Sequence, residues 1–353
     1  MKAPGLLRQG LRLLALLAPL AAHGLPVPAL QLGLQSSWTD NLLGDSLALA
    51  DLGGTLSLRL NQPLSPLLGL EAGGRLTRLS DHGELGEANH TLQLNLGAGG
   101  PLFESLWAQA GWFRQHYQDD YDLYDRDRLF VVLGARRRQG GRLLLRGQFL
   151  ASATRFPSVP DSLDADYRDL SLALGANLAL DLPLALDLES GVQLRRYREL
   201  DPPVDTPWLW TSLRLSRPLG ERTGLRLLTS RRWQLAPGAD DLLSLTESGL
   251  DPGELLWDGW QVEAGLQRLG RRWRSSLTVG WLAADYAAEP GRSARRDESL
   301  QTALACSRIW SVGTKGWQLQ ASLEGTWRRT DSSLTYYGAI TRSLAAGLTL
   351  RTP

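Results

Sequence analysis

The feature that most constrains the fold is an alternation of apolar with small or polar residues over positions 170–194. Before the pair Leu182-Pro183, the apolar residues fall on every second position: Leu170, Leu172, Leu174, Ala176, Leu178 and Leu180. After that pair the even positions are again mainly apolar and the odd positions polar, as in Leu186, Asp187, Leu188 and Glu189. Successive side chains of a strand point to opposite faces, so this period of two predicts two strands joined by a tight turn.

The length of these two strands is typical of a membrane protein. Each keeps its alternation for about 9–11 residues, which is the length that a tilted strand needs to cross a bilayer. Strands of soluble proteins are more often about 5–6 residues long. A helix would scatter the leucines around its circumference. The pattern therefore favours a membrane hairpin, with Leu172, Leu174, Leu186 and Leu188 toward lipid and Asp187, Glu189 and Gln193 toward water.

The first residues have the pattern of a secretory signal. Basic residues between Lys2 and Arg12 precede a short apolar run at 13–18. Small residues that could mark a cleavage site follow at 22–24 and at 27–29. We predict a signal peptide over residues 1–29, with cleavage near 24 or 29, and a barrel over residues 30–353. An N-terminal anchor helix is the alternative, but the apolar run is shorter than the roughly 18 residues that a membrane helix requires.

The alternation recurs along the rest of the chain. We predict about 16 strands, with 14–18 possible, and the least distinct are the first strand, the sixth strand and the junction near Asp331. Their expected ranges are 30–39, 53–62, 66–79, 88–98, 102–117, 128–138, 142–155, 168–181, 184–198, 208–217, 223–235, 257–268, 271–287, 296–309, 317–330 and 333–351.

The connections alternate between short and long. Short ones carry Gly or Pro, as at 61–63, 99–101 and 140–141, because these residues supply the backbone angles that tight turns need. The intervening connections are mostly longer and polar, as at 40–52 and 236–256. This predicts a closed antiparallel barrel with short turns and both termini at one rim, and with longer loops at the other.

Tryptophans gather near the predicted strand ends. Such amphipathic rings favour the headgroup level of a bilayer, so we expect two outward-facing girdles, although the aromatic core of a soluble β-protein is an alternative. The long-loop girdle would contain Trp38, Trp112, Trp233, Trp281 and Trp327, and the short-turn girdle Trp273, Trp310 and Trp317.

Charged residues fall on the polar parity of the strands. A charge facing lipid near mid-bilayer would cost about 2–4 kcal/mol, so these residues are expected to face the lumen. They could pair and fill a closed core, but a barrel of 16 strands is too wide to be filled by its own side chains. The predicted lumen-lining residues are Arg59, Glu71, Arg146, Asp187, Glu189, Arg214, Arg226, Arg232, Glu263, Glu324 and Arg328.

The longest connection, from Pro237 to Leu256, is acidic and contains no Lys or Arg. Arg226 and Arg232 lie on the strand that precedes it, so the loop could be drawn into the mouth of the barrel and narrow it. A solvated loop outside the barrel is the alternative. The constriction would be formed by Asp240, Asp241, Glu247, Asp251 and Glu254.

The remaining chemistry excludes several functions. A net charge of +1 gives no reason to expect nucleic-acid binding, and one cysteine, Cys306, allows no internal disulfide. No phosphate-binding, dinucleotide-binding, CxxC or HExxH motif occurs, so we predict no enzyme activity, no cofactor and no metal. The one suggestive cluster is His116 with Asp119, Asp120 and Asp122, which could activate water. The same Asp run, with Asp125 and Asp127, could hold Ca²⁺, but an acidic loop is more simply solvated.

The signal, the alternating strands, the Gly-Gly turns and the Asp-rich loops together resemble a Gram-negative outer-membrane β-barrel over the whole mature chain. Such barrels usually end in an aromatic residue, whereas this chain ends in Pro353. The resemblance implies a place in the outer membrane among lipid and lipopolysaccharide, and a porin-like channel for passive diffusion of small hydrophilic solutes.

Three alternatives to this function remain. A structural or export-associated barrel would work with a periplasmic or barrel partner that the sequence does not identify. A surface-exposed hydrolase would need the histidine cluster. A soluble propeller or another exported all-β protein would place the apolar face inside.

Overall fold

The structure is a computed structural model. It describes residues 28–41, 50–81, 86–100, 102–117, 125–158, 166–180, 183–197, 204–235, 257–286, 295–313, 316–334 and 338–352. The predicted signal peptide lies almost entirely outside these ranges and stays a prediction.

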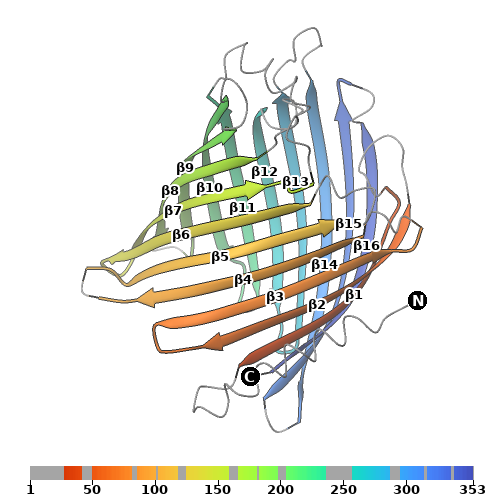
Figure 1. Cartoon of the computed structure of the whole chain (residues 1–353), viewed down its shortest axis with the longest axis horizontal. Helices are drawn as coiled ribbons and strands as arrows, with labels where there is room; N and C mark the ends of the chain where they lie inside the picture. The colour runs from red at the N-terminus through yellow and green to blue at the C-terminus, as the bar shows by residue number, and fades with distance from the viewer. Residues whose placement is uncertain are drawn as a thin grey trace.

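The described residues form sixteen strands and no helices (Figure 1). Their bounds are β1 Ala29–Thr39, β2 Asp51–Pro63, β3 Leu68–Leu79, β4 Glu87–Ala98, β5 Ser105–Tyr117, β6 Arg126–Gln139, β7 Leu143–Arg155, β8 Tyr167–Ala179, β9 Ala185–Tyr197, β10 Val204–Pro218, β11 Thr223–Gln234, β12 Trp257–Leu269, β13 Trp273–Tyr286, β14 Arg296–Val312, β15 Trp317–Ser332 and β16 Ala339–Arg351.

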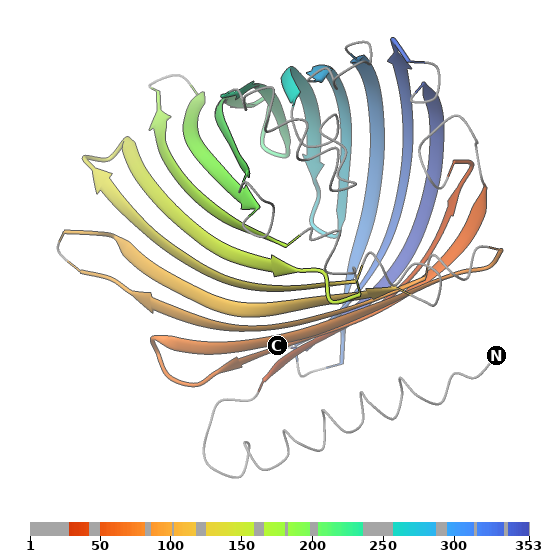
Figure 2. The same ribbon diagram turned by 45° about the horizontal axis from the view of Figure 1, so that its top comes forward.

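The strands close into a single antiparallel barrel (Figures 1 and 2). Each strand pairs with its neighbours in sequence, and β1 pairs with β16 from Gln31 opposite Arg351 to Thr39 opposite Ser343. Closure leaves no strand edge with unpaired N–H and C=O groups. The prediction of a closed antiparallel barrel of about 16 strands is confirmed.

All sixteen predicted strands correspond to observed ones; most starts agree within three residues, and two strands begin four or more residues from the predicted position. Strand β10 begins at Val204, not at 208, because Pro207 is accommodated within the strand. The Pro207 carbonyl accepts hydrogen bonds from the backbone N–H of Leu235 and from the Gln234 side chain, at 3.0 and 2.8 Å. Strand β16 begins at Ala339, not at 333.

The register assigns the two faces of the β8–β9 hairpin. Leu172 lies opposite Val192, whereas Asn177 lies opposite Asp187, so apolar and polar residues keep to separate faces. Leu172 and Leu188 are each 46% exposed on the apolar face. On the polar face, Arg146 of β7 reaches across β8 to side chains of β9, as expected where a curved wall brings side chains together. The polar face is therefore the inner one.

The same parity holds for the tryptophans. All eight that the sequence assigned to the two girdles point outward, together with Trp260, while Trp107, Trp208, Trp210 and Trp257 point inward. Cys306 also lies on the outward parity of β14. The outer surface is thus apolar, with exposed leucines on nearly every strand.

The two rims differ as expected. Short connections such as 140–142 and 313–316 join strands at one rim, where Gly140 and Gly313 adopt positive φ angles of 64° and 68°. Strand β1 begins and strand β16 ends at this rim, where the Leu30 N–H donates to Thr352 Oγ1 at 2.8 Å. The opposite rim carries the long connections, including 235–256 between β11 and β12.

Within the described part of the chain, no helix has the length and apolar character to cross a membrane.

The register can be tested at two adjacent positions of β9. In a Cys306→Ser background and in lipid vesicles, Gln193→Cys should react quickly with a charged, water-soluble maleimide, because it faces the aqueous interior. Val192→Cys should be protected by lipid. The reverse labelling pattern would show that the faces are exchanged, since a slip of one residue turns every side chain to the other side.

Candidate solute pathway

All eleven sequence-predicted lumen residues lie on the inner parity of their strands. The structure brings four of them together near the short-turn rim, on β7, β9 and β10. We call Arg146, Asp187, Glu189 and Arg214 the short-turn cluster. That a solute passes along these residues stays a prediction.

Arg146 is the centre of the short-turn cluster. Its Nε donates to Glu189 Oε2 at 2.9 Å and its Nη1 donates to Asp187 Oδ2 at 3.0 Å. Its Nη2 also lies 2.9 Å from Asp187 Oδ1 and contacts Glu189. Arg214 Nη1 approaches Asp187 Oδ2 from the other side, at 3.9 Å. One guanidinium therefore bridges two carboxylates, and charge-assisted hydrogen bonds of this kind are stronger than neutral ones.

The path of Arg146 across β8 depends on Gly175. A Cβ at position 175 would lie 2.7 Å from Arg146 Nε and 3.0 Å from its Cγ, closer than nonbonded carbon contacts allow. The absence of a side chain lets the guanidinium lie flat over the strand and reach β9. Glycine is thus required here for close approach, not for an unusual φ angle.

A small cavity of about 270 Å³ lies beside the short-turn cluster. Besides the cluster, its lining includes Trp107 and Arg136, and the Arg136 guanidinium lies 5.1 Å from the centroid of the Trp107 ring. This stacking supports the arginine at the cavity wall through a cation–π contact.

The other predicted residues are separate from this cluster. Arg59 pairs with Glu71 at 2.7 Å, and Arg226 pairs with Glu263. Arg328 Nη2 donates to Ser299 Oγ at 3.4 Å. Glu324 is exposed on the inner face of β15.

A second group of inner side chains lies near the long-loop rim. Arg195 donates to Asp169 from Nε at 2.9 Å and from Nη2 at 3.4 Å, and its guanidinium lies 3.9 Å from the centroid of Tyr167. Asp169 is only 2% exposed and Tyr197, which packs edge-on against Tyr167, is 1% exposed. A buried carboxylate requires such a charged partner.

Arg232 belongs to this second group. Its guanidinium lies 4.6 Å from the ring centroid of Trp208 and 4.4 Å from that of Trp257. Arg195 also faces Trp208, at 5.8 Å, so Trp208 links the two arginines. We call Tyr167, Asp169, Arg195, Trp208, Arg232 and Trp257 the loop-end cluster. Along β9, about 26 Å separates Asp187 from Arg195, given about 3.3 Å per residue.

The predicted set omitted several inner residues that parity alone could have found. The inner face of the strands carries fourteen arginines and nine carboxylates. The arginines are Arg59, Arg75, Arg126, Arg128, Arg136, Arg138, Arg146, Arg195, Arg214, Arg226, Arg232, Arg274, Arg328 and Arg351. The carboxylates are Asp51, Glu71, Glu87, Asp169, Asp187, Glu189, Glu263, Asp297 and Glu324.

Two further sequence predictions fall at the long-loop rim. The constriction residues Asp240, Asp241, Glu247, Asp251 and Glu254 lie outside the described residues. His116 lies on the outward face of β5 and its Nδ1 contacts Asp125, while residues 119, 120 and 122 are also outside the described ranges. Among the His, Cys, Asp and Glu residues that the structure describes, none gather in a group that could hold a metal ion.

Solved structures show the same fold. The outer membrane protein OpdK from Pseudomonas aeruginosa matches 93% of this chain over 100% of its own, with 13% identity and a TM-score of 0.53. OccAB3 from Acinetobacter baumannii matches 92% of this chain over 99% of its own, with 11% identity and a TM-score of 0.52.

CdiB from Acinetobacter baumannii matches 91% of this chain but 60% of its own, with 12% identity and a TM-score of 0.51. No protein-family model and no curated protein matches the chain. At these identities, the likeness shows that the chain shares the fold of outer-membrane porins.

The role of Gly175 gives a prediction with a matched control. Gly175→Ala forces Arg146 from its two carboxylates, so the free energy of unfolding should fall by about 1–3 kcal/mol. Gly147→Ala, one strand away, meets Leu174 only at 3.4 Å and should change stability by less than about 0.5 kcal/mol. Urea unfolding in lipid vesicles measures both. Equal effects of the two variants would contradict this account of Gly175.

Proposed function

We propose that this protein is a porin-like channel of the bacterial outer membrane, through which small hydrophilic solutes diffuse passively. The observation that carries this proposal is a closed wall of sixteen strands with an apolar outer face and an inner face bearing charges of both signs. A barrel of this width cannot be filled by its own side chains and leaves an aqueous channel. The fold shared with OpdK and OccAB3 supports the same conclusion.

The charge of the inner face favours anions. Fourteen arginines against nine carboxylates leave a positive excess along the described wall, and several arginines, such as Arg214, are well exposed to the interior. Charged rings in a pore select ions of opposite sign. One neighbouring structure, OpdK from Pseudomonas aeruginosa with vanillate, has 14% identity and a TM-score of 0.53, and vanillate is an organic anion.

Conductance in a planar bilayer tests this function. We expect open pores whose reversal potential in a KCl gradient shows a preference for chloride. Arg214→Gln should reduce that preference and Glu324→Gln should increase it, because both residues are exposed on the inner face. Arg329→Gln, which changes an outward arginine of β15, is the control and should have no effect. An electrically silent barrel, or one that prefers K⁺, would refute the proposal.

We further propose that the acidic connection 237–256 narrows the outer mouth. It carries five carboxylates and no basic residue, and it joins two strands that contribute Arg232 and Trp257 to the loop-end cluster. Attraction between opposite charges is strong in a confined, partly desolvated mouth.

Deletion of residues 240–254 should therefore raise the single-channel conductance. A variant with Asp240, Asp241, Glu247, Asp251 and Glu254 changed to their amides keeps the loop length and isolates the effect of charge. If the deletion leaves the conductance unchanged while the barrel folds normally, the loop does not constrict the pore.

An export-associated barrel is the second candidate. The same conductance experiment separates the two functions, because a barrel that serves only export with a partner would be silent on its own.

A further inference from the structure

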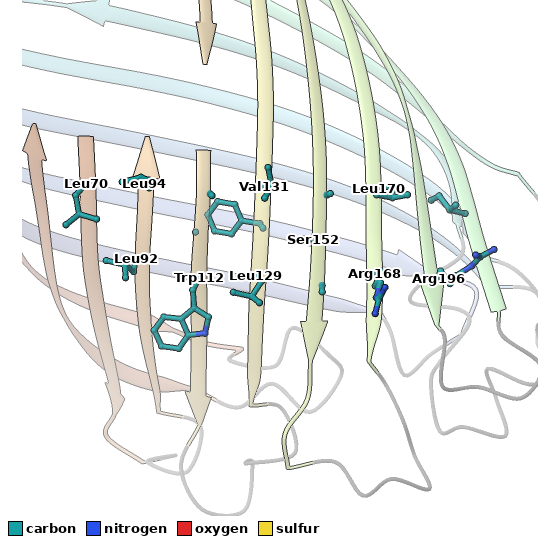
Figure 3. Close-up of a pocket in the computed structure, with 16 residues that line it drawn as sticks. Leu70, Leu92, Leu94, Trp112, Leu129, Val131, Ser152, Arg168, Leu170 and Arg196 are labelled. Carbon is teal, nitrogen blue, oxygen red and sulfur yellow. The ribbon is translucent and has the colours of Figure 1, made fainter. Parts of the chain in front are cut away.

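The outer surface of the barrel contains a groove that the channel function does not use. It has a volume of about 750 Å³ and crosses the outward face of the wall between β3 and β9 (Figure 3). Its floor includes the small residues Ala110, Ala151 and Ala153, and leucines form its sides, among them Leu92 and Leu170. The groove exists because alanines on β5 and β7 leave a hollow between the larger side chains.

Two arginines mark the end of this groove nearest the long-loop rim. Arg168 is the second residue of β8 and Arg196 is the second-last residue of β9, and both line the groove (Figure 3). They lie directly opposite each other in the register of the two strands. Like charges at directly opposed positions are destabilising unless an anion lies between or beside them.

One of the two arginines has a carboxylate partner, and the other has a positive charge that an anion could compensate. Arg196 donates to both oxygens of Asp205, at 2.6 and 2.5 Å, so its charge is compensated within the wall. Arg168 is exposed and makes no ion pair with any residue that the structure describes. A third arginine, Arg155 on β7, lies at the same rim and is paired with Asp166, with its Nε 3.7 Å from Asp166 Oδ2. The end of the groove thus carries the unpaired charge of Arg168, whereas its length is apolar.

We propose that this groove is a binding site for one phosphorylated glycolipid of the lipid A type. Acyl chains lie in the hollow over Ala151 and Ala153, and a phosphate accepts hydrogen bonds from Arg168, with Arg155 and Arg196 nearby. Arginine binds phosphate through paired N–H donors, and basic pockets on membrane proteins recognise lipid head groups in this way. The proposal rests on the outer-membrane location proposed above, but not on the channel being open.

The position of the arginines decides between lipid classes. Long loops of outer-membrane barrels face the cell exterior, so Arg168 lies at the level of outer-leaflet head groups. Lipid A carries its phosphates at that level in the outer leaflet. Trp112, which also lines the groove, is five residues from the long-loop end of β5.

Native mass spectrometry of the full chain in nonionic detergent tests the proposal. The probes are lipid A, the same lipid A without its phosphates, and phosphatidylglycerol. We expect lipid A to bind at least about tenfold more tightly than the dephosphorylated form, since hydrogen bonds to charged groups have this magnitude. Phosphatidylglycerol should bind more weakly than lipid A.

Three variants separate the contributions. Arg168→Gln should weaken lipid A binding about tenfold, and Ala151→Leu should weaken it by filling the hollow without changing charge or exposing a polar group. Arg329→Gln removes an outward arginine from β15, far around the barrel, and should bind lipid A like the unchanged protein. Circular dichroism confirms that each variant is folded before titration.

Each contrary result overturns the proposal in a distinct way. If lipid A and its dephosphorylated form bind equally well, the phosphate is not recognised. The same conclusion follows if Arg168→Gln binds lipid A as tightly as the unchanged protein does. Equal binding of phosphatidylglycerol would remove the preference for the glycolipid. If the protein forms dimers or trimers without bound lipid, and Ala151→Leu dissociates them, the groove is an interface between copies of this chain. A conductance result bears on none of these outcomes.

Discussion

Ring closure by the β1–β16 ladder is the interaction on which the rest of the structure depends. In an apolar environment every backbone N–H and C=O must find a partner within the protein, and each unpaired group costs several kcal/mol. Sixteen strands that each pair on both sides meet this requirement, and the last pair also brings Leu30 beside Thr352. Because the ladder is continuous, the register of one hairpin constrains the next, and the parity of every side chain follows around the whole wall.

On the inner side, that register converts scattered charged residues into two organised clusters. Arg146 joins β7 to β9, and the stacking of Arg195 and Arg232 on Trp208 joins β9 to β11. The Arg146 contacts skip β8, where Gly175 leaves room for the guanidinium, whereas the two stacking contacts connect β9 and β11 through Trp208 of the intervening strand β10. The guanidiniums are therefore held against the inner side of the wall. In the proposed channel, charged groups along the wall would select among ions.

On the outer side, the same register places Arg168 opposite Arg196 above a hollow of alanines. Within one strand, moving from Leu170 to Arg168 changes the surface from apolar to basic, as the depth in a bilayer changes from hydrocarbon to headgroup. The free-energy cost of a lipid-facing arginine is small at the headgroup level, whereas at mid-bilayer it is about 2–4 kcal/mol. The register of strand pairing thus gives the wall one face suited to lipid and one suited to water.

The sequence alone determined the strands and the face of each residue. An alternation with a period of two residues places Leu186 and Leu188 on one side of the strand and Asp187 and Glu189 on the other. It also indicated which rim has short turns, from the Gly and Pro pairs. It misplaced the start of β10, where Pro207 resembles a loop residue but sits inside a strand. Only the tertiary structure decided which charges meet. Parity assigns Arg146 to the inner face, but its partners depend on curvature, on the missing side chain at Gly175 and on strands that are not its neighbours. The outer groove likewise required three dimensions, because it arises where alanines of β5 and β7 lie between the leucines of other strands.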